Sequence, residues 1–329
     1  MATTLVSGAA FGAAMMAAGF HNPAVVIEQF KFENWHMLQA FLAATAASGL
    51  ICAVAEQVGY VKLQPRSSSP LGLFAKYDGN VIGGALLGVG TALSGSCPGT
   101  LYPQLAAGVR TGLYALAGAS VGGILWAGVL GKAVKKQRES AGVRPEAGVV
   151  NDALGLSRAT TLLLLEAACL AVITATTIYT PRNANTVLLG ATGGLLVGLA
   201  QLVSILTRRS SIGISGAYEE IGHVFWWLVG GADPGARPAS HQNLLFASGV
   251  AAGAWGLLRA VPALAAVPPV EVPPALAVAG GALMAVGSRM AGGCTCGHGI
   301  SGISLLSASS VMTIATAFAA GGLVAPLVH

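Results

Sequence analysis

The sequence has little charge. Only 9% of its 329 residues are Asp, Glu, Lys or Arg, whereas a soluble globular domain carries roughly 25%. A chain with so few charges cannot cover a water-facing surface, and 54% of it is hydrophobic. A disordered chain and a collagen are excluded as well, because the sequence is apolar and lacks a Gly-X-Y period. The composition predicts an integral membrane protein that contacts the lipid bilayer and does not bind nucleic acid.

Two further absences concern processing and disulfides. The first 27 residues contain no Lys or Arg, so the basic start of a signal peptide is missing, and we expect the N-terminal apolar segment to be retained. The cysteines are few, odd in number and never spaced as Cys-x-x-Cys, which disfavours a disulfide framework. They are Cys52, Cys97, Cys169, Cys294 and Cys296. Cys52 and Cys169 lie within unbroken apolar runs and are expected to be packing residues.

Long uncharged runs predict about nine membrane crossings, because a charge at the bilayer centre costs roughly 2.5 to 3.5 kcal/mol. A further apolar stretch, 221–231, is too short to span and is expected to lie in the interface or to re-enter. The predicted crossings are residues 4–20, 35–58, 78–96, 112–131, 159–180, 186–207, 242–262, 275–292 and 302–323.

The basic residues are distributed unevenly between the predicted loops. With the N-terminus in the cytosol, twelve Lys and Arg residues fall in loops on that side and three fall outside, in agreement with the positive-inside rule. We therefore predict a cytosolic N-terminus and an outside C-terminus, in the cell membrane. The inside group is Lys62, Arg66, Lys76, Lys132, Lys135, Lys136, Arg138, Arg144, Arg158, Arg208, Arg209 and Arg237, and the outside group is Lys31, Arg110 and Arg182.

Two apolar segments in the two halves of the chain are alike. Residues 83–97 read GGALLGVGTALSGSC and residues 280–294 read GGALMAVGSRMAGGC, with eight identities in fifteen positions. Chance likeness between Gly/Ala-rich helices is the alternative explanation. One connecting span between two four-span halves makes the second half enter the membrane from the opposite side, as in inverted-repeat transporters. The expected parts are a first membrane repeat (1–131), a hydrophilic cytosolic linker (132–158), a connecting span (159–180) and a second, inverted repeat (181–329) of an all-α polytopic fold with broken or re-entrant helices.

Glycine, proline and cysteine interrupt two of the expected helices. Non-helical backbone at membrane depth is tolerated only inside protein or beside a water-filled cavity, so these breaks are the candidate lining of a transport path. A helix that restarts after a break presents free N–H groups and a positive dipole end, which favour an anion. The candidate residues are Gly95, Ser96, Cys97, Pro98, Gly99 and Thr100 in the first break, and Cys294, Cys296, Gly297, His298, Gly299, Ser301 and Gly302 in the second.

The cysteines of the two breaks favour a ligand that contains sulfur. A neutral thiol is a weak donor with a polarizable sulfur, whereas a thiolate would repel a dianion, so we predict transport with protonated thiols. The alternatives are plain packing for Cys97 and Cys294, and a thiol that points elsewhere for Cys296. Zinc at Cys294, Cys296 and His298 lacks the second ligand pair of a structural site, and His298 is better explained as a hydrogen-bond donor. No metal and no cofactor are expected.

Two motifs resemble those of a known family. Gly-Ser-Cys-Pro-Gly at 95–99 and Gly-Cys-Thr-Cys-Gly-His-Gly-Ile-Ser-Gly at 293–302 resemble the YeeE/YedE sulfur-transport family, and the resemblance covers most of the chain. It implies an hourglass-shaped membrane protein of two inverted halves that takes up thiosulfate. It also implies a relay of the ion by transient S–H hydrogen bonds at Cys97 and Cys294, without covalent transfer, and a cytosolic sulfur carrier that receives the ion.

Three other positions have two interpretations each. Members of the family often carry a cysteine where this chain has His21, which either donates a hydrogen bond to the anion or marks the loss of the outer relay point. Arg289 lies about 140° from Cys294 around an ideal helix, and it either balances the anion or reaches the inner interface. The segment 208–216 is either the cytosolic end of the path or a marker of the inner membrane surface.

Two functions other than sulfur-anion uptake are consistent with the residues. A membrane thiol oxidoreductase or sulfurtransferase would use Cys294 and Cys296, but the spacing is Cys-x-Cys, and no quinone or flavin signature is present. A channel for another small solute would have dispensable thiols. We therefore expect a transporter rather than an enzyme.

Overall fold

The computed structural model describes residues 1–231 and 238–329, and Arg237, one of the predicted inside basic residues, lies outside them. The described part of the chain is helical, with β pairing limited to isolated bridges. The first half contains α1 (Ala2–Ala17), α2 (Pro23–Phe30), α3 (His36–Gln57), α4 (Asp78–Ser94), α5 (Leu101–Ala106), α6 (Arg110–Leu125), the π-helical turn η1 (Trp126–Leu130), α7 (Gly131–Ser140) and α8 (Val150–Leu154). The remainder contains α9 (Arg158–Tyr179), α10 (Gly190–Arg208), α11 (Gly216–Val229), α12 (Gln242–Ala260), the 3-10 turn η3 (Pro262–Ala265), α13 (Pro274–Ala291), the π-helical segment η4 (Cys296–Gly302) and α14 (Ala308–Val328).

Six helices in the described residues are long and apolar enough to cross a membrane. They are α3, the continuous helix Arg110–Ser140, α9, α10, α13 and α14. The chain is therefore an all-α polytopic membrane protein, which confirms the fold class expected from composition. The count of nine crossings stays a prediction, since α1 has 16 residues, α4 has 17, and α12, although 19 residues long, is not among the six. The predicted linker, which starts at residue 132, begins inside a helix.

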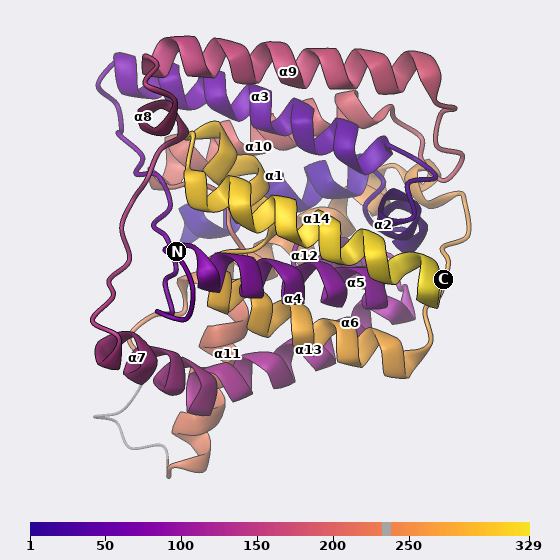
Figure 1. The fold of residues 1–329 in the computed structure, drawn as a ribbon. Helices are drawn as coiled ribbons and strands as arrows, with labels where there is room; N and C mark the ends of the chain where they lie inside the picture. The colour runs from indigo at the N-terminus through magenta and orange to yellow at the C-terminus, as the bar shows by residue number, and fades with distance from the viewer. Residues whose placement is uncertain (232–237) are drawn as a thin grey trace.

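The long helices run across the molecule between the two ends of the chain (Figure 1). The N-terminus lies on one side and the C-terminus on the opposite side, with α7 and the segment that follows it near the N-terminal side. Helix α9 lies along the outer edge and packs on α3, and within it only Thr161 and Cys169 are buried. Most of the surface of α9 is therefore available to lipid.

Helices α4 and α13 pack closely, because glycine on both helices brings their backbones together. A Cβ added to Gly83 would lie 2.7 Å from the carbonyl oxygen of Gly287, and one added to Gly287 would lie 2.6 Å from that of Gly83. Gly90 and Gly280 have the same mutual relation at 2.5 Å. No side chain larger than hydrogen fits at these four positions without moving a helix.

The other helix contacts form reciprocal pairs. Helix α1 packs on α12 and α3 packs on α10, while α4 packs on α14 and α6 packs on α13. Each pair joins one element of the first half to one of the second, so the two halves are interleaved rather than side by side. This interleaving places the ends of α4 and α13, where the two breaks begin, in the middle of the bundle.

Candidate functional site

The first break begins where α4 ends at Ser94. Gly95 adopts a left-handed conformation with φ of 58°, which glycine reaches without steric cost, and the chain turns back toward α5. Three side chains hold the turn. The Ser96 hydroxyl donates to Gln104 Oε1 at 2.5 Å, Gln104 Nε2 donates to the Gly95 carbonyl at 3.0 Å, and the Cys97 amide donates to Thr100 Oγ1 at 2.7 Å.

The second break begins in the same way and then differs. Helix α13 ends at Ala291, and Gly292 is left-handed with φ of 86°. The chain then forms the π-helical segment η4, in which every residue from Cys296 to Gly302 is buried. Contacts from distant parts of the sequence hold it: Thr45 Oγ1 donates to the Gly299 carbonyl at 2.8 Å, and Ser301 Oγ donates to the Ile212 carbonyl at 3.0 Å.

The two breaks meet at their thiols. Cys97 is 2% exposed, and Cys294 and Cys296 are fully buried. The Cys296 thiol lies close to the thiols of both Cys97 and Cys294. Cys296 is thus the middle of three adjoining thiols. Its side chain points toward the thiols of the two breaks and not away from them.

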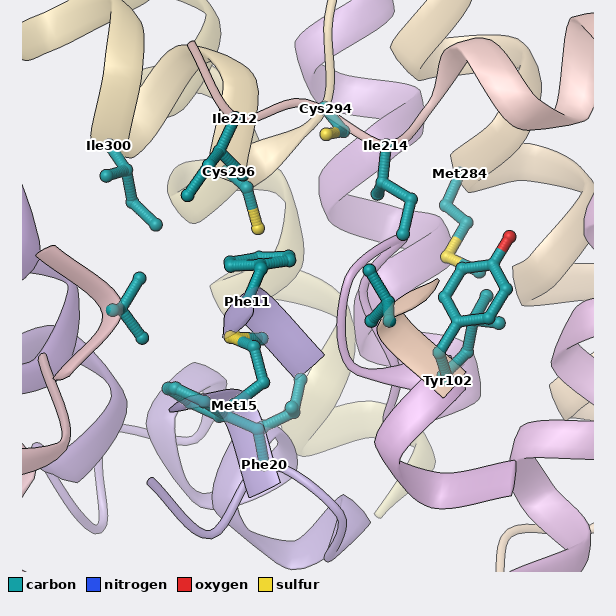
Figure 2. Packing of buried hydrophobic residues seen from close by; sticks show 14 of the residues in the cluster. Phe11, Met15, Phe20, Tyr102, Ile212, Ile214, Met284, Cys294, Cys296 and Ile300 are labelled. Carbon is teal, nitrogen blue, oxygen red and sulfur yellow. The ribbon is translucent and has the colours of Figure 1, made fainter. Parts of the chain in front are cut away.

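Glycine on the first break makes room for the middle thiol. A Cβ added to Gly99 would lie 2.9 Å from Cys296 Sγ, 3.5 Å from Met15 Cε and 3.7 Å from Phe11 Cζ. Figure 2 shows Phe11 between Cys296 and Met15. When the like segments are aligned on Cys97 and Cys294, Gly99 corresponds to Cys296. One break therefore supplies a thiol at the position where the other supplies the space for it.

Backbone amides surround the outer two thiols. The amides of Gly99 and Thr100 are directed at Cys97, and those of Ile214, Ser215 and Gly297 are directed at Cys294. Ser215 directly precedes α11, and the buried Ile214 lies beside Cys294 (Figure 2). Donors that converge near a helix start suit the oxygen atoms of an anion.

Two tyrosines complete the wall of the site. Tyr218 on α11 is fully buried, and its hydroxyl donates to the Pro98 carbonyl at 2.9 Å. Tyr102 on α5 is 6% exposed and lies beside Met284 (Figure 2), and its side chain lies close to that of Tyr218. Neither tyrosine was a sequence candidate, because each lies just beyond a candidate segment and nothing in the sequence brings the two together.

The remaining sequence candidates lie around the thiols rather than among them. His298 Nδ1 pairs with Ser310 Oγ at 2.9 Å, and a Cβ added to Gly302 would lie 2.0 Å from that same oxygen. His21 is buried in the connection between α1 and α2, and its polar neighbour is the backbone of Met16. Cys52 packs with Ile205 and Leu305 in a separate cluster.

The second break is held by an arginine that sequence reasoning placed only among the basic loop residues. Arg66 lies between α3 and α4, and its guanidinium donates from Nε to the Gly297 carbonyl at 2.6 Å and from Nη1 to the Gly292 carbonyl at 3.0 Å. Arg289 forms an ion pair with Glu219. No sequence signal joins Arg66 to the break, because the two are more than 220 positions apart.

The donor set does not resemble a metal centre. Within residues 1–231 and 238–329, no three His, Cys, Asp or Glu side chains are grouped so as to hold a metal ion. All five cysteines are free. The chemistry that this arrangement offers is hydrogen bonding by thiols, amides and hydroxyls.

Comparison with known proteins assigns the family. The family model described as "Sulphur transport" matches residues 17–324, a range that contains both breaks and all five cysteines. A comparison with curated proteins found no match. A chain with these helices and this match is a membrane transporter whose function concerns sulfur, and it belongs to the sulphur transport (YeeE/YedE) family.

Proposed function

We propose that this transporter takes up thiosulfate through a central path lined by Cys97, Cys296 and Cys294. The observation that carries the proposal is the continuity of the three thiols, because Cys296 reaches the thiols of both breaks. Thiosulfate is a dianion with a terminal sulfur, so the ligand has one part for S–H donors and another for N–H donors. The site supplies both kinds of donor within one buried region.

The anion moves by exchange of hydrogen bonds, with the thiols protonated throughout. A thiol that donates to the terminal sulfur leaves the oxygens free for the amides that surround Cys97 and Cys294. The Ser96 and Thr100 hydroxyls, with Gly95 and Pro98, keep the first break in shape, and His298, Gly299, Ser301 and Gly302 do the same for the second. His21 would meet the anion at the outer end. No covalent bond to sulfur forms in this relay.

The path crosses a molecule of two inverted halves, residues 1–131 and 181–329, with a cytosolic N-terminus in the cell membrane. The opposite placement of the chain ends in Figure 1 and the reciprocal contacts of Gly83 with Gly287 and of Gly90 with Gly280 support this arrangement. A sulfur carrier protein would receive the ion in the cytosol.

The test is uptake of radiolabelled thiosulfate into proteoliposomes by the full chain and its Cys97→Ala and Cys294→Ala variants. A lost hydrogen bond is worth about 0.5 to 1.5 kcal/mol, so each variant should slow uptake by about three- to tenfold. Cys52→Ala is the matched control, because Cys52 is buried in a separate cluster. Unimpaired uptake in both test variants would refute the relay and favour a channel with dispensable thiols.

The same experiment separates transport from catalysis. An enzyme that attacked thiosulfate through Cys294 would keep the terminal sulfur as a persulfide and release sulfite. Release of sulfite in step with uptake, and its loss in Cys294→Ala, would favour the sulfurtransferase. Recovery of intact thiosulfate inside the vesicles supports the transporter.

A further inference from the structure

A cavity of about 620 Å³ opens on the N-terminal side of the bundle. Its walls come from the loop between α3 and α4, from η1 and α7, from α11 and from the end of α13. Its volume lies within the range of about 300 to 1,000 Å³ that is typical of small-ligand pockets. The charged residues in its lining are Arg66, Lys132, Lys135, Arg138 and Arg289, with Glu219 as the one carboxylate.

Helix α7 presents its basic residues to the cavity in a regular order. Lys132, Lys135 and Arg138 follow one another at three-residue intervals and therefore share a face of the helix. Arg138 is fixed there, since its guanidinium donates to the Pro70 carbonyl at 2.8 Å and to Ser69 Oγ at 2.6 Å. Lys135 lies at the open rim of the cavity, with a side chain that is 80% exposed, whereas its neighbour Lys136, which is also exposed, is not part of the lining.

The positive charge of the cavity is only partly neutralised. Glu219 forms its ion pair with Arg289 and lies 3.8 Å from His223, and Lys135 has Glu139 on its own helix at 4.0 Å. Among the described residues, Arg66 and Lys132 have no carboxylate within ion-pair distance. Several cations that share a confined space raise the local concentration of anions.

Arg66 joins this cavity to the thiol site. Its guanidinium lines the cavity and also donates to the carbonyls of Gly292 and Gly297, which flank Cys294 and Cys296 in the sequence. A Cβ at Gly293 would lie 2.9 Å from Nη1, and one at Gly297 would lie 2.7 Å from Nη2. The arginine thus contacts the second break at three glycines and faces the cavity as well.

We propose that this cavity, which we call the basic vestibule, is a second anion site that holds the dianion between the thiols and the N-terminal side of the membrane. The proposal rests on the proposed function for the identity of the anion, and it adds a site that works by charge rather than by thiol chemistry. An anion that leaves Cys294 meets Arg66 first, and Lys132 and Lys135 then attract it away from the break.

The test compares two adjacent lysines in the full chain, held in nanodiscs of zwitterionic lipid. Lys135 lines the vestibule and Lys136 does not. An amine-reactive reagent acetylates both lysines, and mass spectrometry measures the rate at each one. The rates are compared with thiosulfate, sulfate or chloride added at equal ionic strength. A dianion that occupies the vestibule for about two thirds of the time or more should slow the labelling of Lys135 by about threefold or more. Lys136 should react at an unchanged rate.

A variant checks that charge in the vestibule causes the protection. Lys132→Gln removes one cation, which is worth about 1 kcal/mol or more at close range, so the thiosulfate concentration for half protection should rise about fivefold. Lys136→Gln should leave it unchanged. Equal protection of both lysines, or protection by chloride as strong as by sulfate, would overturn the proposal.

The two proposals can fail separately. Protection of Lys135 without thiosulfate uptake into proteoliposomes would leave the vestibule standing and remove the proposed function. Uptake that depends on Cys97 and Cys294, with no protection of Lys135, would do the reverse.

Discussion

The two breaks have related sequences but are held in different ways. The first is held mainly by its own neighbours, since Ser96, Thr100 and Gln104 make hydrogen bonds within nine positions of one another, and the Tyr218 hydroxyl adds a bond from α11 to the Pro98 carbonyl. The second is held from far along the chain by Arg66 and Thr45, each more than 220 positions away. The first break is therefore mostly locally held, whereas the second depends on its hydrogen bonds to Arg66 in the loop between α3 and α4. Of the two, the second is the better candidate for the moving part of the transporter.

The largest expected effect comes from the side chain that closes the first break. Gln104→Leu leaves the Gly95 carbonyl buried without its partner, which costs about 1 to 3 kcal/mol, and it leaves the Ser96 hydroxyl only its longer bond to the Ser94 carbonyl at 3.2 Å. Thr45→Val removes one of several bonds to the second break and should cost about 1 kcal/mol. Denaturant unfolding of the purified chain in detergent measures both. Equal losses would contradict the distinction between a locally held and a remotely held break.

The next effect concerns the exposure of the thiols. Arg66→Lys keeps the charge, but a single ammonium cannot replace a guanidinium that bridges two carbonyls. The loss of about 1.5 kcal/mol in charged hydrogen bonding should make local opening of the second break about tenfold more frequent.

Maleimide labelling read by mass spectrometry checks this effect. Cys294 should react about tenfold faster in the variant, while Cys97 and Cys169, which is buried on the outer helix α9, keep their rates. If Cys97 accelerates as much as Cys294, the breaks open together, and the asymmetry between them is wrong.

A smaller effect tests the contact between the breaks. Gly99→Ala places a methyl group 2.9 Å from Cys296 Sγ, and overpacking of this kind costs about 1 to 3 kcal/mol. Cys296→Ala removes the sulfur and should recover most of that cost in the double variant. A double-mutant cycle on the free energy of unfolding measures this coupling. Additive losses would mean that Gly99 and Cys296 do not share the space.

The smallest expected effect is a difference in the pH dependence of stability between the segments that follow the two breaks. The Glu271 carboxylate accepts from the amides of Arg110 and Thr111, both at 2.9 Å, where α6 starts after the first break. Burial raises the pKa of this carboxyl, but the hydrogen bonds from Arg110 and Thr111 outweigh it, and the pKa lies below its ordinary value. The stabilisation is therefore present above the ordinary pKa and is lost as pH falls through the folded-state pKa.

Unfolding at several pH values checks that sign. Glu271→Gln should cost about 1 kcal/mol at neutral pH, as for other caps, and the gap to wild type should close in acid. After the second break, at the start of α14, the Ser309 hydroxyl donates to the Arg66 carbonyl at 3.0 Å, and neither group titrates. The gap between Ser309→Ala and wild type should therefore not change with pH.

The sequence predicts the breaks well because their causes are local. Left-handed glycines at 95 and 292 end their helices, and Pro98 prevents the first from continuing. The equivalent cysteines, Cys97 and Cys294, identify both breaks as candidate site segments. Membrane-spanning helices can be predicted from the sequence as well, since they depend on runs of apolar residues.

The partners of the breaks could not be predicted, because they depend on how distant elements pack. Arg66 belongs to a polar loop, and nothing near it in the sequence points to Gly292 or Gly297. The position of Cys296 depends on an empty space at Gly99, on the other break. Arg289 had two interpretations, and its ion pair with Glu219 beside the vestibule requires the placement of α11, which no periodicity in α13 specifies.

The backbone contact between α4 and α13 also bears on the history of the chain. Gly83 and Gly90 each abut a glycine carbonyl of the other helix, so a larger residue on either helix collides with backbone rather than with a side chain that could adapt. A change on one helix cannot be compensated by a change on the other, because no smaller residue than glycine exists. Substitution of these glycines is therefore disfavoured on both helices at once. In two related halves, sequence similarity would persist at this contact after it had been lost from the rest of the chain.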